Sequence, residues 1–152
     1  GVQSHADAVA DMEPVLFEGA KQQGEEAFTA VVVMLPGILA VENHGGLSGD
    51  PMVLAEFVQH IHSPHLGVCL DLGNFESDRA IGMQTLAPHA IHVHAKSREF
   101  NAQGDETQID YGTCMSTLKS AGYAGAISIE YEGDGDPVIG ITRTRELIEM
   151  YA

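Results

Sequence analysis

The stretch "LGVCLDL", residues 66–72, is apolar over nearly its whole length and carries a single acidic residue, Asp71, close to its end. Three further runs have the same character: "GILAVEN" (37–43), "AIHVHA" (90–95) and "AISIEY" (126–131). Strands of a parallel sheet are buried on both faces and therefore read as nearly continuous apolar runs. We expect these four runs to be strands of one parallel sheet.

Helical patterns lie between these runs. In "SGDPMVLAEFVQHIH" (48–62), Ser48 or Asp50 can cap a helix whose first position is Pro51. Comparable patterns occupy residues 77–87, 110–122 and 136–152. Strands that alternate with helices in this way are typical of βαβ units, so the sequence predicts an α/β fold with a parallel sheet.

The leading segment, residues 1–36, is harder to interpret. Its stretch "EEAFTAVVVML" (25–35) begins with helix-forming acids and ends with β-branched residues. We expect a helix there, with a strand as the alternative. The remaining residues, 37–152, then form four strand–helix units, and the whole chain is one partial domain.

The composition excludes several kinds of partner. The chain has 22 acidic against 7 basic residues and a formal net charge of −15, which opposes binding to nucleic acid or to an anionic membrane. The longest apolar run (30–41) is far shorter than the ~20 residues that span a bilayer. Cys69 and Cys114 lack CxxC spacing, so we expect neither a thiolate metal site nor a disulfide, and a cytoplasmic location.

An acidic or imidazole side chain occurs near the end of each expected strand: Glu42, Asp71, His94 and Glu130. The carboxyl ends of parallel strands lie on one side of the sheet, so these side chains are expected to converge. Three carboxylates and an imidazole would repel one another or ionise abnormally unless a cation lay between them. The ligand set predicts a divalent metal, Mn²⁺ or Mg²⁺ first, with Co²⁺ and Zn²⁺ as alternatives.

Each of these residues also has a plainer explanation. Asp71 is in a sequence context suited to a turn or helix cap, His94 to a hydrogen-bonded core position, and Glu42 to a loop. Glu130 is harder to explain in this way, because an unpaired carboxylate inside a sheet is costly. The occurrence of all four at one βα spacing favours the metal site.

Several blocks resemble the C-terminal half of the xylose isomerase-like (β/α)8 barrels, and in particular the sugar phosphate isomerase/epimerase group. These blocks are "LAVENHGG", "LGVCLDLGNF", "IHVHAKS", "IDYGTCMSTLKSAGYAGAISIEYEG" and "RTRELI". The resemblance implies that Glu42, Asp71, His94 and Glu130 follow the fifth to eighth barrel strands and bind the metal. It further implies that Glu42 and Glu130 are the catalytic acid/base pair.

The activity implied by the resemblance is isomerisation or epimerisation of a sugar or sugar phosphate through an enediolate that the metal stabilises. A dehydratase acting on a polyol ketone, and a non-catalytic fragment, remain as alternatives. Phosphodiester cleavage, as in the AP endonuclease branch, requires further metal ligands and a basic surface, which the net charge argues against.

Further side chains are expected to contact the substrate. These are His44, Asn74, His92, Lys96, Arg98 and Glu132. Lys96 resembles the lysine of the family's "HxKD" motif, although Ser97 replaces the usual Asp. Asn74 is equally suited to a turn, His92 to the core and Arg98 to a solvated loop.

A complete barrel of this kind needs ~250 residues, whereas this chain has 152. The chain begins with Gly1, and we expect it to be a fragment of a longer product. An open four-stranded sheet has two exposed edges, so self-association through these edges is the alternative.

Overall fold

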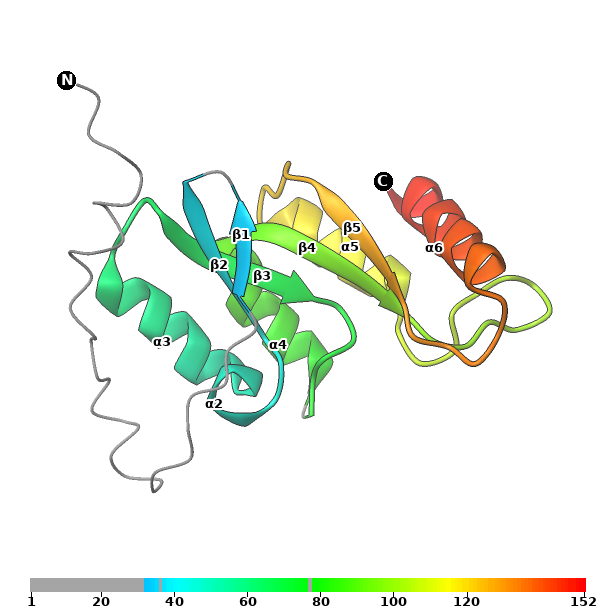
Figure 1. Cartoon of the computed structure of the whole chain (residues 1–152), viewed down its shortest axis with the longest axis horizontal. Helices are drawn as coiled ribbons and strands as arrows, with labels where there is room; N and C mark the ends of the chain where they lie inside the picture. The colour runs from blue at the N-terminus through cyan, green and yellow to red at the C-terminus, as the bar shows by residue number, and fades with distance from the viewer. Residues whose placement is uncertain (1–31, 36, 77) are drawn as a thin grey trace.

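The computed structural model describes residues 37–76 and 78–152, and the backbone of residues 32–35. The described residues contain one five-stranded sheet (Figure 1). Its strands, in spatial order, are β1 (Val32–Leu35), β2 (Ile38–Glu42), β3 (Leu66–Asp71), β4 (Ala90–Ser97) and β5 (Ile127–Tyr131). β2 to β5 pair in parallel, each with the next along the chain. This confirms the α/β class and a parallel sheet of partial-barrel type.

Helices connect the parallel strands as the sequence predicts. They are α2 (Gly46–Gly49), α3 (Pro51–Ile61), α4 (Arg79–Leu86), the 3₁₀ turn η2 (Ala87–His89), α5 (Tyr111–Ser120) and α6 (Pro137–Tyr151). Each of the four longer helices begins after an aspartate whose carboxylate accepts backbone N–H groups of the first turn: Asp50, Asp78, Asp110 and Asp136. Such caps stabilise a helix by about 1 kcal/mol each. No helix among the described residues is both long and apolar enough to cross a membrane.

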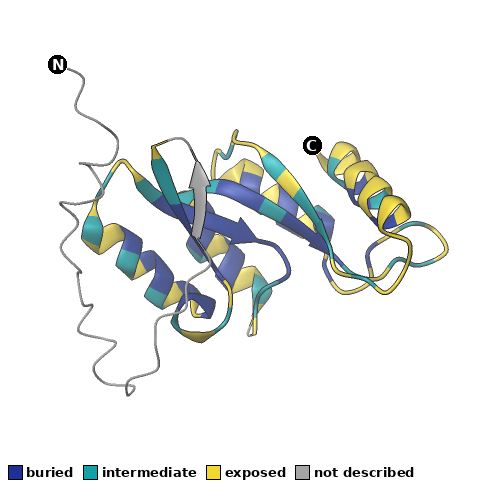
Figure 2. Cartoon of the chain, viewed as in Figure 1, coloured by how far each residue is buried: buried dark blue, intermediate teal, exposed yellow. Residues whose placement is uncertain are grey.

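The core lies between the sheet and the helices. Val68 and Leu70 of β3 pack in one buried cluster with Leu54 of α3 and Leu86 of α4. Because side chains alternate along a strand, the neighbouring Asp71 lies on the opposite face. Figure 2 shows the burial concentrated in the central strands and on the helix sides toward them, while α6 is largely exposed. The face of the sheet away from the core therefore carries the polar groups of the candidate site.

The expected helix over residues 25–35 is wrong at 32–35, where the strand alternative is correct; residues 25–31 lie outside the described part. β1 pairs antiparallel with β2, in a register that places Leu35 opposite Ile38. The connection includes Gly37, whose φ of 76° is readily adopted only by glycine. The β-branched residues at the end of the stretch suit an extended strand better than its leading acids suit a helix.

The expectation of two sheet edges holds for the described residues, although the sheet has five strands instead of four. One edge strand is β5, and the other is β1, which covers β2. β5 is also less buried than β3, whose residues from Gly67 to Asp71 are all buried. Self-association through an edge stays a prediction, and it concerns β1 or β5.

Candidate metal centre

The structure brings the four predicted residues together. Glu42 ends β2, Asp71 ends β3, His94 lies within β4 and Glu130 lies near the end of β5. One potential ligand atom from each lies within 4.8 Å of the others. The parallel register explains the convergence, because Asp71 is directly opposite His94 in the sheet. We refer to these four residues as the EDHE cluster, and it could hold a metal ion.

β4 differs from its expected bounds in a way that matters for this cluster. The sequence predicts a strand over residues 90–95, whereas β4 extends to Ser97. His94 is therefore not at the end of the strand, and Lys96 lies within it on the same face. Lys96 is paired in register with Glu130 of β5. The longer strand thus adds a lysine to the cluster's surroundings.

Burial and charge shift the pKa values within the cluster. Asp71 is fully buried, and this burial raises the pKa of its carboxyl to about 6 against the opposing effect of Lys96. His94 Nδ1 lies 3.4 Å from Glu42 Oε1 and 2.9 Å from Glu130 Oε1. Its interaction with Glu42, and then the charge of Glu130, raise the pKa of His94 although burial opposes this. Both groups therefore hold a proton more readily than a free side chain would.

Two buried atoms of the cluster lack a hydrogen bond of normal geometry. Asp71 Oδ1 accepts the backbone N–H groups of Gly73 at 2.7 Å and Asn74 at 2.8 Å, whereas Asp71 Oδ2 has no hydrogen-bond partner. His94 Nδ1 is likewise without one, despite its two carboxylate neighbours. Buried polar atoms are nearly always satisfied, so each exception requires an explanation. A divalent cation coordinated by both atoms would supply it, and the oxygen-rich donor set with one imidazole suits such an ion.

Lys96 supplies part of the positive charge that balances the carboxylates, a role that the sequence predicted for the metal alone. Its Nζ lies 3.5 Å from Asp71 Oδ2, 3.4 Å from Glu130 Oε2 and 2.8 Å from Glu132 Oε1. The side chain is only 2% exposed, yet the carboxylates outweigh this burial and raise the pKa of Lys96. Repulsion among the acids is therefore a weaker argument for a metal than the two unsatisfied atoms are.

Besides Lys96, two of the expected substrate-binding residues lie beside the cluster. Asn74 donates from Nδ2 to Glu42 Oε1 at 3.2 Å and accepts from Lys96 Nζ at 3.0 Å. His92 is buried, and its Nε2 shares a hydrogen bond of 2.9 Å with Ser128 Oγ. Burial lowers the pKa of His92. Both side chains thus have structural partners of their own, whatever contact they make with a substrate.

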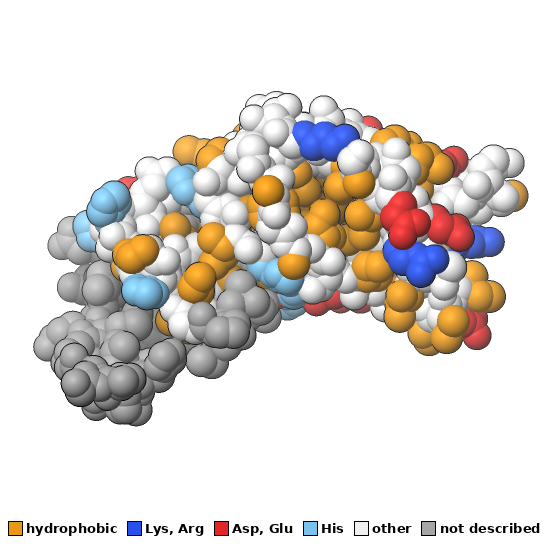
Figure 3. Space-filling view, turned by 90° about the horizontal axis from the view of Figure 1, so that it is seen from above, with side chains coloured by type: hydrophobic (Ala, Val, Ile, Leu, Met, Phe, Trp, Pro, Cys, Tyr) orange, Lys and Arg blue, Asp and Glu red, His pale blue; other side chains and the backbone are white. Residues whose placement is uncertain are grey.

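The remaining expected substrate contacts divide into two groups. His44 is exposed in the loop after β2, and the structure does not place it in the EDHE cluster. Arg98 and Glu132 form an ion pair at 3.2 Å beyond the cluster. The hydrogen bond from Lys96, followed by the interaction with Arg98, lowers the pKa of Glu132. Figure 3 shows acidic and basic side chains lying side by side toward one end of the molecule.

Asn43, which connects the ends of β2 and β3, was not predicted as a site residue. This fully buried side chain donates from Nδ2 to the carbonyl oxygen of Asp71 at 3.0 Å and accepts the Asp71 N–H at 2.7 Å. It therefore fixes the spacing between Glu42 and Asp71. Its position inside the "ENH" motif is the only signal that could have identified it.

Glu106 was also missed. Its carboxylate is buried in the loop between β4 and α5, where it accepts the backbone N–H groups of Arg98 at 3.2 Å, Gln108 at 2.6 Å and Ile109. These bonds hold the loop that carries Arg98. No sequence pattern marks this residue, because its partners are backbone groups of an irregular loop.

The fold and the site together define a parallel α/β protein of partial-barrel type with a polar cluster toward the carboxyl ends of its strands. Residues 20–152 match the family described as Xylose isomerase-like TIM barrel, and the chain belongs to this family. The resemblance noted from the sequence is thereby confirmed.

Curated relatives include enzymes of two kinds. The chain is 25% identical to L-ribulose-5-phosphate 3-epimerase UlaE of Escherichia coli (strain K12) over 141 residues, which are 87% of the chain and 48% of the relative. It is 36% identical to the C-glycoside deglycosidase alpha subunit of Microbacterium trichothecenolyticum over 73 residues, 46% of the chain and 20% of the relative. An uncharacterized protein of Methanocaldococcus jannaschii is 29% identical over 127 residues, 76% of the chain and 41% of the relative. The chain spans less than half the length of each of these relatives.

Proposed function

We propose that this chain is the metal-binding part of a sugar isomerase or epimerase that transfers a proton through an enediolate. The observation that carries the proposal is the EDHE cluster, in which Asp71 Oδ2 and His94 Nδ1 are buried without hydrogen bonds. The similarity to an epimerase supports it. Because the chain covers less than half of these relatives, the activity proposed is that of a protein containing this chain.

The EDHE residues would bind a divalent cation, Mn²⁺ or Mg²⁺ in preference, through the carboxylates of Glu42, Asp71 and Glu130 and the imidazole of His94. Such an ion, when bound, polarises the substrate's oxygen atoms and makes the proton next to the carbonyl more acidic. Asp71 is fully buried and held by backbone N–H groups, so we assign it to ion binding rather than to proton transfer.

Glu42 and Glu130 are the proposed acid/base pair, and their surroundings differ. Glu42 is 3% exposed and accepts a hydrogen bond from Asn74. Glu130 has a side chain that is 34% exposed and lies between His94 and Lys96. Glu130 can exchange a proton with solvent more readily, whereas Glu42 is enclosed. We assign to Glu42 the proton transfer that is shielded from solvent. We assign to Glu130 the proton transfer in which the proton can exchange with solvent.

A lyase is the second candidate. The similarity to a deglycosidase subunit supports it, with 36% identity over 73 residues. The same proton abstraction next to a carbonyl can be followed by loss of a leaving group from the adjacent carbon instead of reprotonation. A polyol-ketone dehydratase is the form of this reaction in which water leaves.

Calorimetric titration of the 152-residue chain with Mn²⁺ tests the metal site. We expect about one ion per chain, and at least tenfold weaker binding in Glu42→Gln and in Glu130→Gln. Glu56→Gln is the matched control, because Glu56 is exposed on α3. Absence of Mn²⁺ binding by the unaltered chain, or equal binding by all three variants, would refute the proposal. In the intact protein, deuterium uptake from solvent without loss of a leaving group separates the epimerase from the lyase.

A further inference from the structure

The ammonium group of Lys96 has more oxygen neighbours than it has protons to donate. Asn74 Oδ1 at 3.0 Å and Glu132 Oε1 at 2.8 Å accept hydrogen bonds from it. Glu130 Oε2 at 3.4 Å and Asp71 Oδ2 at 3.5 Å lie farther away, and Asp71 Oδ2 accepts no hydrogen bond. An ammonium can donate only three hydrogen bonds. The bonds to Asn74 and Glu132 therefore hold this group away from the two oxygens of the EDHE cluster.

The rest of the Lys96 side chain has little freedom to move. A Cβ atom added to Gly73 would lie 2.8 Å from Lys96 Cδ and 3.1 Å from Ile109 Cδ1, so the lysine side chain passes closely over the Gly73 backbone. Tyr111 Oη donates to the backbone carbonyl oxygen of Lys96 at 2.7 Å. With the backbone and the methylene groups held in this way, only the ammonium end can shift among its four oxygen neighbours.

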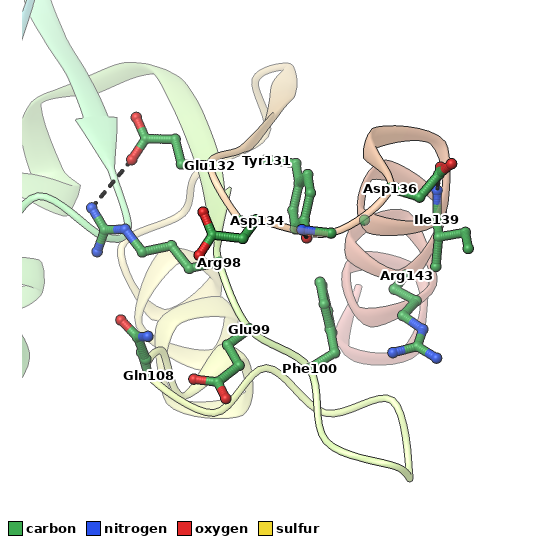
Figure 4. A pocket seen from close by; sticks show the side chains of 13 residues that line it. Arg98, Glu99, Phe100, Gln108, Tyr131, Glu132, Asp134, Asp136, Ile139 and Arg143 are labelled. Atoms are coloured by element: carbon green, nitrogen blue, oxygen red, sulfur yellow. Dashed lines mark hydrogen bonds and ion pairs between the residues drawn. The ribbon is translucent and has the colours of Figure 1, made fainter.

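Glu132 is itself held in place from two directions. Its backbone N–H donates to the carbonyl oxygen of Ser97 at 2.8 Å, directly after the paired parts of β4 and β5. Its Oε2 lies 3.2 Å from the guanidinium of Arg98, as Figure 4 shows. Glu106 accepts the backbone N–H of Arg98 and so fixes the loop that carries it. The half-exposed carboxylate of Glu132 is thus fixed beside Lys96.

Two simpler roles fit Glu132 less well. An exposed ion pair contributes little, but Lys96 is only 2% exposed, so Glu132 is the partner of a buried charge. A substrate hydroxyl, which the sequence led us to expect, would have to share oxygens that already accept hydrogen bonds from Lys96 and Arg98. Neither role explains why Asp71 Oδ2 accepts no hydrogen bond from an ammonium 3.5 Å away.

We propose that Glu132 is a positioning residue: held by Arg98, it keeps the ammonium of Lys96 off two oxygens of the EDHE cluster. These oxygens are Asp71 Oδ2 and Glu130 Oε2. The proposal rests on the proposed function, in which both oxygens are ligands of a divalent cation. An ammonium that donates to a ligand oxygen occupies a lone pair and competes with the cation for it. Glu132 thus raises the affinity of the cluster for the ion without contacting the ion.

Calorimetric titration of the 152-residue chain with Mn²⁺ tests this role. In Glu132→Ala the ammonium loses its shortest hydrogen bond and moves toward the cluster, so we expect about tenfold weaker Mn²⁺ binding. The control Asp134→Ala removes an exposed acid two residues farther along, and it should change the affinity by less than about threefold. Circular dichroism checks that each variant is folded. Equal Mn²⁺ affinities of Glu132→Ala and the unaltered chain would overturn the proposal.

A second substitution separates positioning from the loss of a charge. Removal of a carboxylate weakens cation binding by electrostatics alone, and that effect does not need Lys96. In the Lys96→Met background, the positioning role predicts that Glu132→Ala changes the Mn²⁺ affinity by less than about threefold. The double variant should then bind Mn²⁺ at least as tightly as the unaltered chain. A merely structural role of Glu132 would not give this recovery, and an equal loss in both backgrounds would overturn the proposal.

The outcomes distinguish this proposal from the proposed function. Absence of Mn²⁺ binding by the unaltered chain would overturn both. Mn²⁺ binding that is weakened in Glu42→Gln but unchanged in Glu132→Ala would overturn the positioning role alone.

Discussion

The replacement Lys96→Met tests how the charges around the EDHE cluster are balanced. Lys96 is almost fully buried, and Met fills a similar volume without the charge. The change leaves Asp71 without the ammonium group that lies 3.5 Å from its Oδ2. Removing one partner of a buried ion pair costs about 3–5 kcal/mol. The contacts with Glu130 and Glu132 are about one-third to one-half exposed and add at most about 1 kcal/mol each.

Uptake of a proton by Asp71, whose pKa is already raised to about 6, relieves part of this cost. We therefore expect the metal-free variant at pH 7 to lose about 3 kcal/mol of unfolding free energy, or about 6–12 °C in Tm. Mn²⁺ replaces the missing charge, so the difference should shrink when the ion is present. Recovery of half of the loss corresponds to about tenfold tighter Mn²⁺ binding by the variant.

Urea unfolding with and without Mn²⁺, together with calorimetric titration, measures both quantities. Lys119→Met is the control, because Lys119 is exposed in the last turn of α5. It should change the unfolding free energy by less than about 1 kcal/mol and leave the Mn²⁺ affinity unaltered. Unchanged stability of metal-free Lys96→Met, or weaker Mn²⁺ binding by it, would refute this reasoning.

Two further predictions concern the same carboxyl ends of the strands. Protons compete with the ion for Asp71 and His94, whose pKa values are both raised, so Mn²⁺ affinity should rise with pH and be lost as the pH falls through about 6. Calorimetry between pH 8 and 5 checks this, and a constant affinity would contradict it. Asn43→Ala removes hydrogen bonds to both the N–H and the carbonyl of Asp71 and should lower the unfolding free energy by about 2–3 kcal/mol. The control Gln84→Ala, at an exposed position on α4, should change the unfolding free energy by less than about 0.5 kcal/mol. Equal losses in the two variants would argue against this role of Asn43.

The parallel sheet could be predicted because strands buried on both faces are nearly continuous apolar runs in the sequence. Val68 and Leu70 contact the core, while Cys69 between them is also fully buried, and the run therefore looks continuous rather than alternating. Aspartates placed before Pro51 and Pro137 marked two helix starts. β1 was predicted only as the alternative to a helix, because the β-branched residues of its stretch follow helix-forming acids, and its antiparallel pairing with β2 leaves no pattern in the sequence.

The convergence of the EDHE cluster could be predicted because parallel strands bring their carboxyl ends to one side. The partners of Lys96 could not, since they depend on the register that sets Lys96 beside Glu130. Glu106 was beyond prediction for a related reason. Its role consists of hydrogen bonds to the backbone of a loop whose path follows no periodic pattern.

The aspartates that cap the helices have a consequence for the rate at which ions reach the site. In a parallel βα arrangement each helix begins on the side where the preceding strand ends, so Asp50, Asp78, Asp110 and Asp136 surround the same rim as the cluster. With a formal net charge of −15, the chain has a negative field that is reinforced at this rim. Such a field speeds the diffusional encounter with cations and slows that with anions, and salt weakens both effects. Residues that start the helices thus also bias which solutes arrive.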